Sequence, residues 1–164
     1  MRRPIIALLC QLACLFVLTI GPTAAAEQAP RNEQLLLKPD DLVYVVAHSA
    51  VDCPVCKVWR ASSTGLPLAM KLSETWPKVR FVLIERRYLA GSEDESLYPP
   101  ELHALYQDRK GRYQLSPATP LFEIVIRDKV VLRLAGLQAW NEQVVPSVQY
   151  LERNRETVSS AEQK

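Results

Sequence analysis

The sequence has little of what several classes of function require. Its 164 residues include two histidines, four cysteines and five glycines, with no glycine-rich phosphate-binding loop, no internal repeat and no low-complexity segment. Basic and acidic side chains almost balance, at 20 and 18. So small a net charge gives no electrostatic reason to expect a nucleic acid or an anionic membrane surface as a partner. No Ser/His/Asp order and no pair of glutamates points to hydrolysis.

The longest apolar run lies at the N-terminus. Arg2 and Arg3 give the chain a short basic start, and residues 4–20 are almost wholly apolar. Three small residues, Ala24–Ala26, follow. This order is typical of a secretory signal peptide and predicts cleavage after Ala26. An uncleaved membrane anchor is the alternative, but this apolar run is at the short limit for crossing a bilayer. We therefore expect an exported, periplasmic protein.

Cleavage would leave one pair of cysteines. Cys10 and Cys14 lie within the signal peptide, whereas Cys53 and Cys56 remain in a compartment where disulfides persist. A structural zinc site needs four ligands, and two cysteines with two histidines match no finger or ribbon spacing. Residues 27–164 have a normal length for a single domain.

Hydrophobic patterns predict an α/β domain over residues 42–154, between a lead-in at 27–41 and a polar tail at 155–164. We expect strands at 42–47, 79–84, 121–126 and 130–134, the last two as an antiparallel hairpin. Helical patterns cover 56–76 with an interruption, the later part of 93–109 after a polar loop, and a last segment in which Pro146 either kinks the helix or opens its second part. A mixed sheet of about four strands with helices on both faces fits these elements.

The Cys53-Pro54-Val55-Cys56 motif follows the first strand directly. If Cys53 begins a helix, Cys56 lies on the same face, within reach of a disulfide. The helix N-terminus favours an anion, so the first thiol should ionise readily and act as a nucleophile, with its neighbour resolving the mixed disulfide. A structural bridge is the alternative, although closing so short a loop stabilises a protein by only about 2 kcal/mol.

These features together resemble the thioredoxin superfamily. The strand leading into the cysteine pair, Ala118-Thr119-Pro120 ahead of the hairpin, Gly136 and a C-terminal helix occur in the order found in that family. The resemblance implies a thioredoxin-like fold in which Pro120 is cis and packs beside the cysteines. It also implies that the backbone of Thr119 pairs with an extended substrate peptide.

The predicted function is that of a protein-disulfide oxidoreductase with Cys53 as nucleophile, Cys56 as resolving residue and the two together as the redox disulfide. Its substrates would be exported cysteine-containing proteins, and a membrane electron-transfer protein would be a suitable redox partner. We expect a monomer without cofactor or metal, because the dithiol itself carries the electrons. A non-catalytic peptide-binding or protein-binding module with a structural disulfide is the rival hypothesis.

Several residues depart from the thioredoxin pattern. Pro-Val replaces Gly-Pro between the cysteines, and Asp52 replaces the tryptophan before the first, where it either opposes ionisation of Cys53 or caps the helix. The first strand offers no buried acid, and Glu85 is predicted to be an exposed strand end, with a substitute proton acceptor as the alternative. His48 is interpreted as an ordinary hydrogen-bonded residue, and the charges at 86–87 and 93–95 as solvated loop residues.

Overall fold

The computed structural model describes residues 37–162, so the predicted signal peptide and most of the predicted lead-in lie outside the described residues. Four strands form one sheet in the order β2-β1-β3-β4. They are β1 (Val43–Ala50), β2 (Val79–Arg86), β3 (Leu121–Ile126) and β4 (Lys129–Ala135). The pair β1–β2 is parallel, whereas β1–β3 and β3–β4 are antiparallel.

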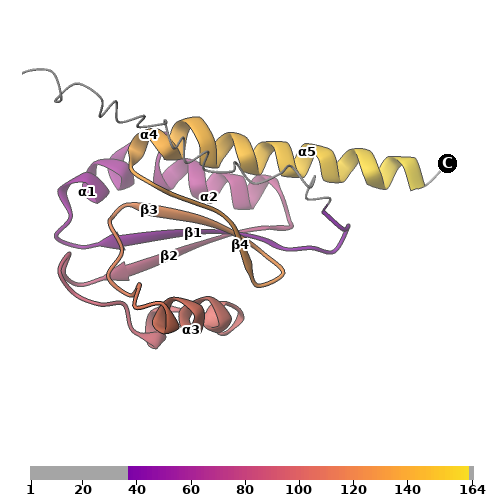
Figure 1. Cartoon of the computed structure of the whole chain (residues 1–164). Coiled ribbons are helices and arrows are strands. Elements are labelled where there is room, and N and C mark those ends of the chain that lie inside the picture. Colours follow the sequence, from indigo (N-terminus) through magenta and orange to yellow (C-terminus); the bar gives the residue numbers. More distant parts are fainter. Residues whose placement is uncertain (1–36, 163–164) are drawn as a thin grey trace, which may run out of the picture. The chain divides into compact units, whose positions relative to one another are not determined.

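Helices cover both faces of this sheet (Figure 1). On one side lie α1 (Pro54–Ala61), α2 (Leu66–Thr75) and α5 (Val145–Glu162), and on the other α3 (His103–Gly111). Short helical turns complete the chain: η1 (Glu95–Leu97), η2 (Pro100–Leu102), α4 (Leu137–Ala139) and the π-helical η3 (Trp140–Val144). This is the thioredoxin-like fold that the sequence predicts, with the mixed sheet confirmed.

Alternation along the strands divides the core into two layers. Odd positions of β1, such as Val43 and Val45, face α1, α2 and α5, where Trp59, Phe122 and Trp140 pack with ring centroids 4.8–5.4 Å apart. Even positions face α3, in a second cluster. A strand that is buried on both faces has a nearly continuous apolar sequence, and such runs made these strands recognisable in the sequence.

The first two strands are longer than their apolar runs indicate. His48, Ser49 and Ala50 continue β1, and each pairs in register with β2, up to Ala50 opposite Arg86. The apolar patterns end at Ala47 and Ile84, because polar side chains occupy the carboxyl ends of both strands. These polar strand ends lie where β1 leads into the cysteine motif.

The C-terminal helix resolves the two interpretations of Pro146. Pro146 is the second residue of α5 and follows the π-helical turn, so this proline opens the second part of the helical segment. The α5 helix continues to Glu162, into the segment assigned to a polar tail. The Arg155 side chain donates hydrogen bonds to the carbonyl oxygens of Lys38 and Pro39, at 2.9 and 3.2 Å, and so joins α5 to the start of the described chain.

Within residues 37–162, no helix combines the length and the apolar character that crossing a bilayer requires.

Gly65 lies at a close approach between the start of α2 and the end of α1. A Cβ atom there would lie 2.7 Å from the Trp59 carbonyl carbon and closer still to its oxygen. Because backbone atoms cannot move aside cheaply, Gly65→Ala should lower the free energy of unfolding by about 3 kcal/mol. Chemical denaturation would measure it. Gly111→Ala is the control, because a Cβ there meets nothing within 4 Å; an equal loss in the control would contradict the steric explanation.

Candidate functional site

Cys53 and Cys56 form a disulfide at the N-terminus of α1. Their Cα atoms lie 5.2 Å apart, and Pro54 occupies the first turn of the helix, as the motif predicted. Cys53 is the N-cap, because its Sγ accepts a hydrogen bond of 3.2 Å from the Cys56 N–H. Exposure is slight, at 2% for Cys53 and 0% for Cys56. The first sulfur therefore faces backbone donors of the helix start, where an anion is stabilised.

The structure brings Thr119 and Pro120 to the cysteines. The Thr119–Pro120 peptide bond is cis, as the resemblance implies. The Thr119 carbonyl oxygen lies 3.8 Å from Cys53 Sγ, across 66 positions of sequence. The Pro120 carbonyl accepts a 2.9 Å hydrogen bond from the Gly136 N–H, which joins this loop to the one after β4. The positions of both residues fit the predicted substrate contact, and the contact itself stays a prediction.

Asp52 does not cap α1. Cys53 holds that position, and the Asp52 carboxylate instead accepts a 2.6 Å hydrogen bond from the Leu89 N–H. It thereby connects the cysteine segment to the loop that follows β2.

Arg86, expected to be solvated, is buried, so that prediction was wrong. Its guanidinium donates to the carbonyl oxygens of Tyr88, Leu89 and Pro117, at 3.2, 2.9 and 2.7 Å. Three backbone acceptors and the nearby Glu93, at 3.6 Å, replace the water that a surface arginine would bind.

A second group of charges lies buried beneath β1 and β3, on the α3 side of the sheet. His48 Nδ1 lies 2.8 Å from Glu93 and its Nε2 lies 3.1 Å from Glu123. Arg109 of α3 and Arg133 of β4 both donate to Glu123, at 2.8 and 2.5 Å. Glu93 was predicted to be a solvated loop residue, which is wrong, whereas His48 is hydrogen-bonded as predicted.

The pKa of Glu123 reflects this surrounding charge. Burial by itself would raise the pKa of a carboxyl group, but the hydrogen bond and charge of His48, together with Arg109 and Arg133, lower it to about 2. Tyr98 donates a 2.5 Å hydrogen bond to Glu93. Burial is the main reason that the pKa of Tyr98 lies far above its usual range, and the hydrogen bond to Glu93 raises this pKa further. Glu123 therefore remains ionised and Tyr98 remains neutral across the physiological pH range.

Glu85 lies on the opposite face, beneath α1, and is half-buried rather than exposed. It forms an ion pair with Arg60 of α1 and accepts a 3.1 Å hydrogen bond from the Ser49 hydroxyl. Glu85 therefore contributes to holding α1 on the carboxyl end of the parallel strands.

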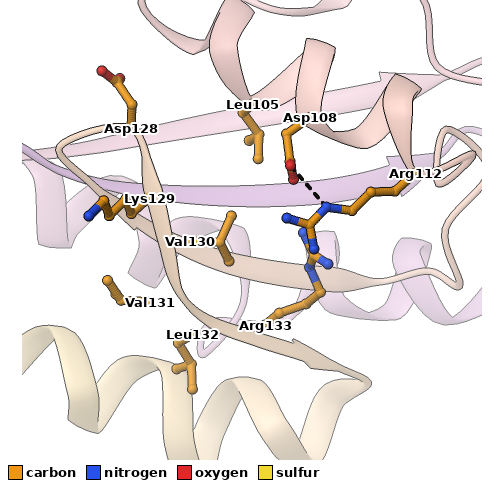
Figure 2. A pocket seen from close by; sticks show the side chains of 9 residues that line it. All are labelled: Leu105, Asp108, Arg112, Asp128, Lys129, Val130, Val131, Leu132 and Arg133. Atoms are coloured by element: carbon orange, nitrogen blue, oxygen red, sulfur yellow. Dashed lines mark hydrogen bonds and ion pairs between the residues drawn. The ribbon is translucent and has the colours of Figure 1, made fainter. Parts of the chain in front are cut away.

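A separate hollow of about 590 Å³ lies between α3 and β4 (Figure 2). Leu105, Val130 and Leu132 form part of its lining, and Asp108 pairs with Arg112 across 2.9 Å at its edge. None of its lining residues belongs to the segments around the disulfide. Among the described residues, no three His, Cys, Asp or Glu side chains are grouped to hold a metal ion.

Comparisons with known proteins identify structural neighbours only. No protein-family model and no curated protein matches the chain. Thioredoxin f from spinach chloroplast is similar at 21% identity over 70% of this chain and 80% of its own, with a TM-score of 0.43. Thioredoxin f2 of Chlamydomonas reinhardtii is similar at 19% over 70% and 84%, with a TM-score of 0.43. Thioredoxin O2 of Arabidopsis thaliana follows at 15% over 68% and 74%, with a TM-score of 0.39.

At such TM-scores the fold assignment rests on the chain itself. The sheet order, the strand directions and the cysteine motif between β1 and α1 carry it, together with the loop before β3.

Proposed function

We propose that this protein is an exported thiol–disulfide oxidoreductase that acts on cysteine-containing proteins through Cys53 and Cys56. One observation supports this most. Cys53 Sγ is both the N-cap of α1 and a neighbour, at 3.8 Å, of the Thr119 carbonyl oxygen. A thiolate at that position would be stabilised by the helix start and would lie beside a backbone group able to pair with a peptide.

The reductive half-reaction uses only the two thiols. The Cys53 thiolate attacks one sulfur of a substrate disulfide, forms a mixed disulfide and releases the other substrate sulfur as a thiolate, which takes up a proton. Cys56, deprotonated, then attacks Cys53 Sγ, displaces the second substrate thiolate and closes the Cys53–Cys56 disulfide. Two electrons pass from the protein to the substrate. The reverse sequence oxidises a substrate dithiol.

Thr119 and Pro120 would bind the substrate backbone. An extended peptide that pairs with Thr119 would bring its cysteine to Cys53 Sγ, since the two groups are adjacent in this structure. The substrates would be exported proteins with cysteines, and turnover would require a redox partner, for which a membrane electron-transfer protein is suitable. The protein would act as a periplasmic monomer, and the dithiol needs no added cofactor.

A second function is supported by the burial of the disulfide. With Cys53 at 2% and Cys56 at 0% exposure, the bond has little contact with solvent. A non-catalytic thioredoxin-fold module that binds a peptide or protein would use the same Thr119–Pro120 edge and keep the disulfide as a structural bridge. Only the reactivity of the thiols separates the two functions.

The reduction potential is the first measurement. The full chain, carrying Cys10→Ala and Cys14→Ala, would be equilibrated against glutathione buffers and its thiols trapped. We expect a reversible two-electron transition. A reduction potential of about −270 mV would indicate a reductant, and one of about −120 mV would indicate an oxidant. A pair that stays oxidised below about −300 mV is a structural disulfide, and that outcome would favour the binding module.

Trapping of the intermediate provides the second test. In the same background, Cys56→Ser removes the resolving thiol, so a mixed disulfide between Cys53 and glutathione should accumulate when oxidised glutathione is added. Intact-protein mass spectrometry would show the gain of one glutathione. A Cys56→Ser protein that remains unmodified would contradict the proposed oxidoreductase.

A further inference from the structure

The loop that follows β2, residues 87–91, is attached to both segments that border the disulfide. The Leu89 N–H donates to Asp52, the residue before Cys53, at 2.6 Å. Arg86 Nη2 donates to the Leu89 carbonyl oxygen at 2.9 Å and also to the Pro117 carbonyl oxygen at 2.7 Å. One guanidinium nitrogen therefore bridges the 87–91 loop and the loop that contains Thr119 and Pro120.

Further hydrogen bonds fix the loop from below. Arg86 Nε donates to the Tyr88 carbonyl oxygen at 3.2 Å, and the Gly91 N–H donates to the same carbonyl at 2.9 Å. The Ser116 hydroxyl donates to the Gly91 carbonyl oxygen at 3.1 Å. The buried Arg86 side chain lies 3.6 Å from Glu93, itself hydrogen-bonded to His48. The Tyr88 and Leu89 carbonyl oxygens of the loop are thus hydrogen-bonded to Arg86, which itself lies beside the buried Glu93.

Two side chains of this loop are large, apolar and exposed, and the exposed Arg87 guanidinium lies over the Tyr88 ring, 5.1 Å from its centroid. Tyr88 and Leu89 expose 54% and 44% of their surface, and Val51 and Val55, which flank Cys53, expose 49% and 45%. Val51 and Tyr88 both line a hollow of about 370 Å³. Grouped exposed apolar residues are unfavourable in water and typically mark a binding surface. Val51 and Val55 each lie two positions from Cys53 in the chain, and the disulfide itself is almost buried.

The position of the 87–91 loop restricts which part of a bound peptide can contact it. Asp52 adjoins Cys53 in the chain and accepts the Leu89 N–H at 2.6 Å, so the loop lies next to the segment that carries the nucleophilic cysteine. An extended peptide advances about 3.4 Å per residue, so a side chain one or two positions from the substrate cysteine would reach Tyr88 and Leu89. An apolar side chain at that place would remove apolar surface from water on both partners.

We infer that Tyr88 and Leu89 form a specificity wall, which selects an apolar residue beside the reactive cysteine of an extended substrate peptide. Arg86 and Asp52 are the positioning residues that hold this wall against the disulfide. The inference rests on the proposed oxidoreductase function and names the substrate feature that its site recognises.

The test uses two synthetic peptides, each carrying one cysteine in a mixed disulfide with glutathione. They are identical except for leucine or serine next to the cysteine. The reduced full chain, with Cys10→Ala and Cys14→Ala, should cleave the leucine peptide with a kcat/KM about tenfold above that of the serine peptide, because the leucine is buried in the complex. Tyr88→Ser and Leu89→Ser should each remove most of this preference, mainly through KM.

Controls separate the wall from the chemistry. Met70→Ser removes an equally exposed apolar side chain on α2 and should leave the preference unchanged. Met70→Ser should also react with oxidised glutathione within about twofold of the parent protein, because its side chain lies on α2, outside the wall. An unchanged leucine preference in Tyr88→Ser and Leu89→Ser, or no preference in the parent protein, would overturn the specificity wall while the oxidoreductase function stands.

Asp52 provides a matched pair of variants for positioning. Asp52→Asn keeps an oxygen that can accept the Leu89 N–H, whereas Asp52→Ala does not. The leucine preference should survive in Asp52→Asn and fall in Asp52→Ala, with thermal unfolding showing both proteins folded. Equal preferences in the two variants would overturn the positioning role. A parent protein that reacts with neither oxidised glutathione nor either peptide would overturn the proposed function together with this inference.

Discussion

Replacement of Glu123 by alanine should lower the free energy of unfolding by about 4 kcal/mol, because it leaves the buried Arg109 with Glu93, at 3.6 Å, as its remaining charged partner. Glu123 is fully buried and accepts hydrogen bonds from Arg109 and Arg133, with His48 Nε2 at 3.1 Å. Arg109 is almost as deeply buried, and the protein offers it no water in exchange. Urea denaturation with fluorescence detection of the three tryptophans would measure the loss.

The control for this prediction is an exposed ion pair. Asp108 and Arg112 form a 2.9 Å pair in which both side chains are exposed, so Asp108→Ala should change stability by less than about 1 kcal/mol. Losses of equal size in Glu123→Ala and Asp108→Ala would contradict the argument from burial.

The dependence on pH provides an independent readout of the same carboxylate. The pKa of Glu123 is lowered to about 2 in the folded protein, against about 4.3 for an unperturbed glutamate. A lowered folded-state pKa stabilises the protein above the unfolded pKa, and this contribution is lost as the pH falls from about 5 to 2. The stability difference between the parent and Glu123→Gln should therefore shrink by about 3 kcal/mol over that range. A constant difference would show that ionisation of Glu123 does not stabilise the fold.

The sequence could predict the elements whose residues alone determine their structure. The strands at 79 and 121 begin where their apolar runs begin, and the tight 127–128 connection of the hairpin required antiparallel pairing. The cysteine motif was placed correctly at a helix start, because Pro54 suits the first turn and the preceding strand fixes where that turn begins. Each of these features depends on residues close together in the chain.

The buried charges could not be assigned by the same reasoning. Charged residues are usually exposed, and their burial depends on partners that are distant in sequence, such as His48 and Glu123, 75 positions apart. One local signal was present. Glu123 interrupts an otherwise apolar strand that the pattern places in the interior, so a buried acid with a partner was to be expected there. Arg86 carried no such signal, since it ends a strand beside another arginine.

Arg86 connects the buried charges with the segments that border the disulfide. The residue ends β2, contacts the Glu93–His48 pair on one side and donates to the loops on both sides of Cys53 on the other. Arg86, at the carboxyl end of β2, is therefore hydrogen-bonded to two of the segments that border the cysteines. Sites built on packed elements of this kind hold their geometry better than sites on unsupported loops.

Cys53→Ser should abolish disulfide exchange while leaving the start of α1 intact. Serine is among the best N-cap residues, so its hydroxyl oxygen can accept the Cys56 N–H that Cys53 Sγ accepts now. The remaining thiol, Cys56, has 0% exposure and lies within the first turn of the helix. Its reaction with oxidised glutathione should be at least about a hundredfold slower than that of Cys53 in Cys56→Ser, because access and thiolate stabilisation both favour the first position.

Cys56→Ser is the matched control, since each variant lacks the disulfide and retains one thiol. The rates of glutathione addition would be measured by mass spectrometry in the background without Cys10 and Cys14, with circular dichroism confirming equal helix content. Equal rates in the two variants would mean that the helix start does not distinguish the thiols, and the assignment of Cys53 as nucleophile would be wrong. A fast Cys53 with an inert Cys56 would fix the order of attack and resolution, because only the thiol that reacts with external disulfides can form the first mixed disulfide.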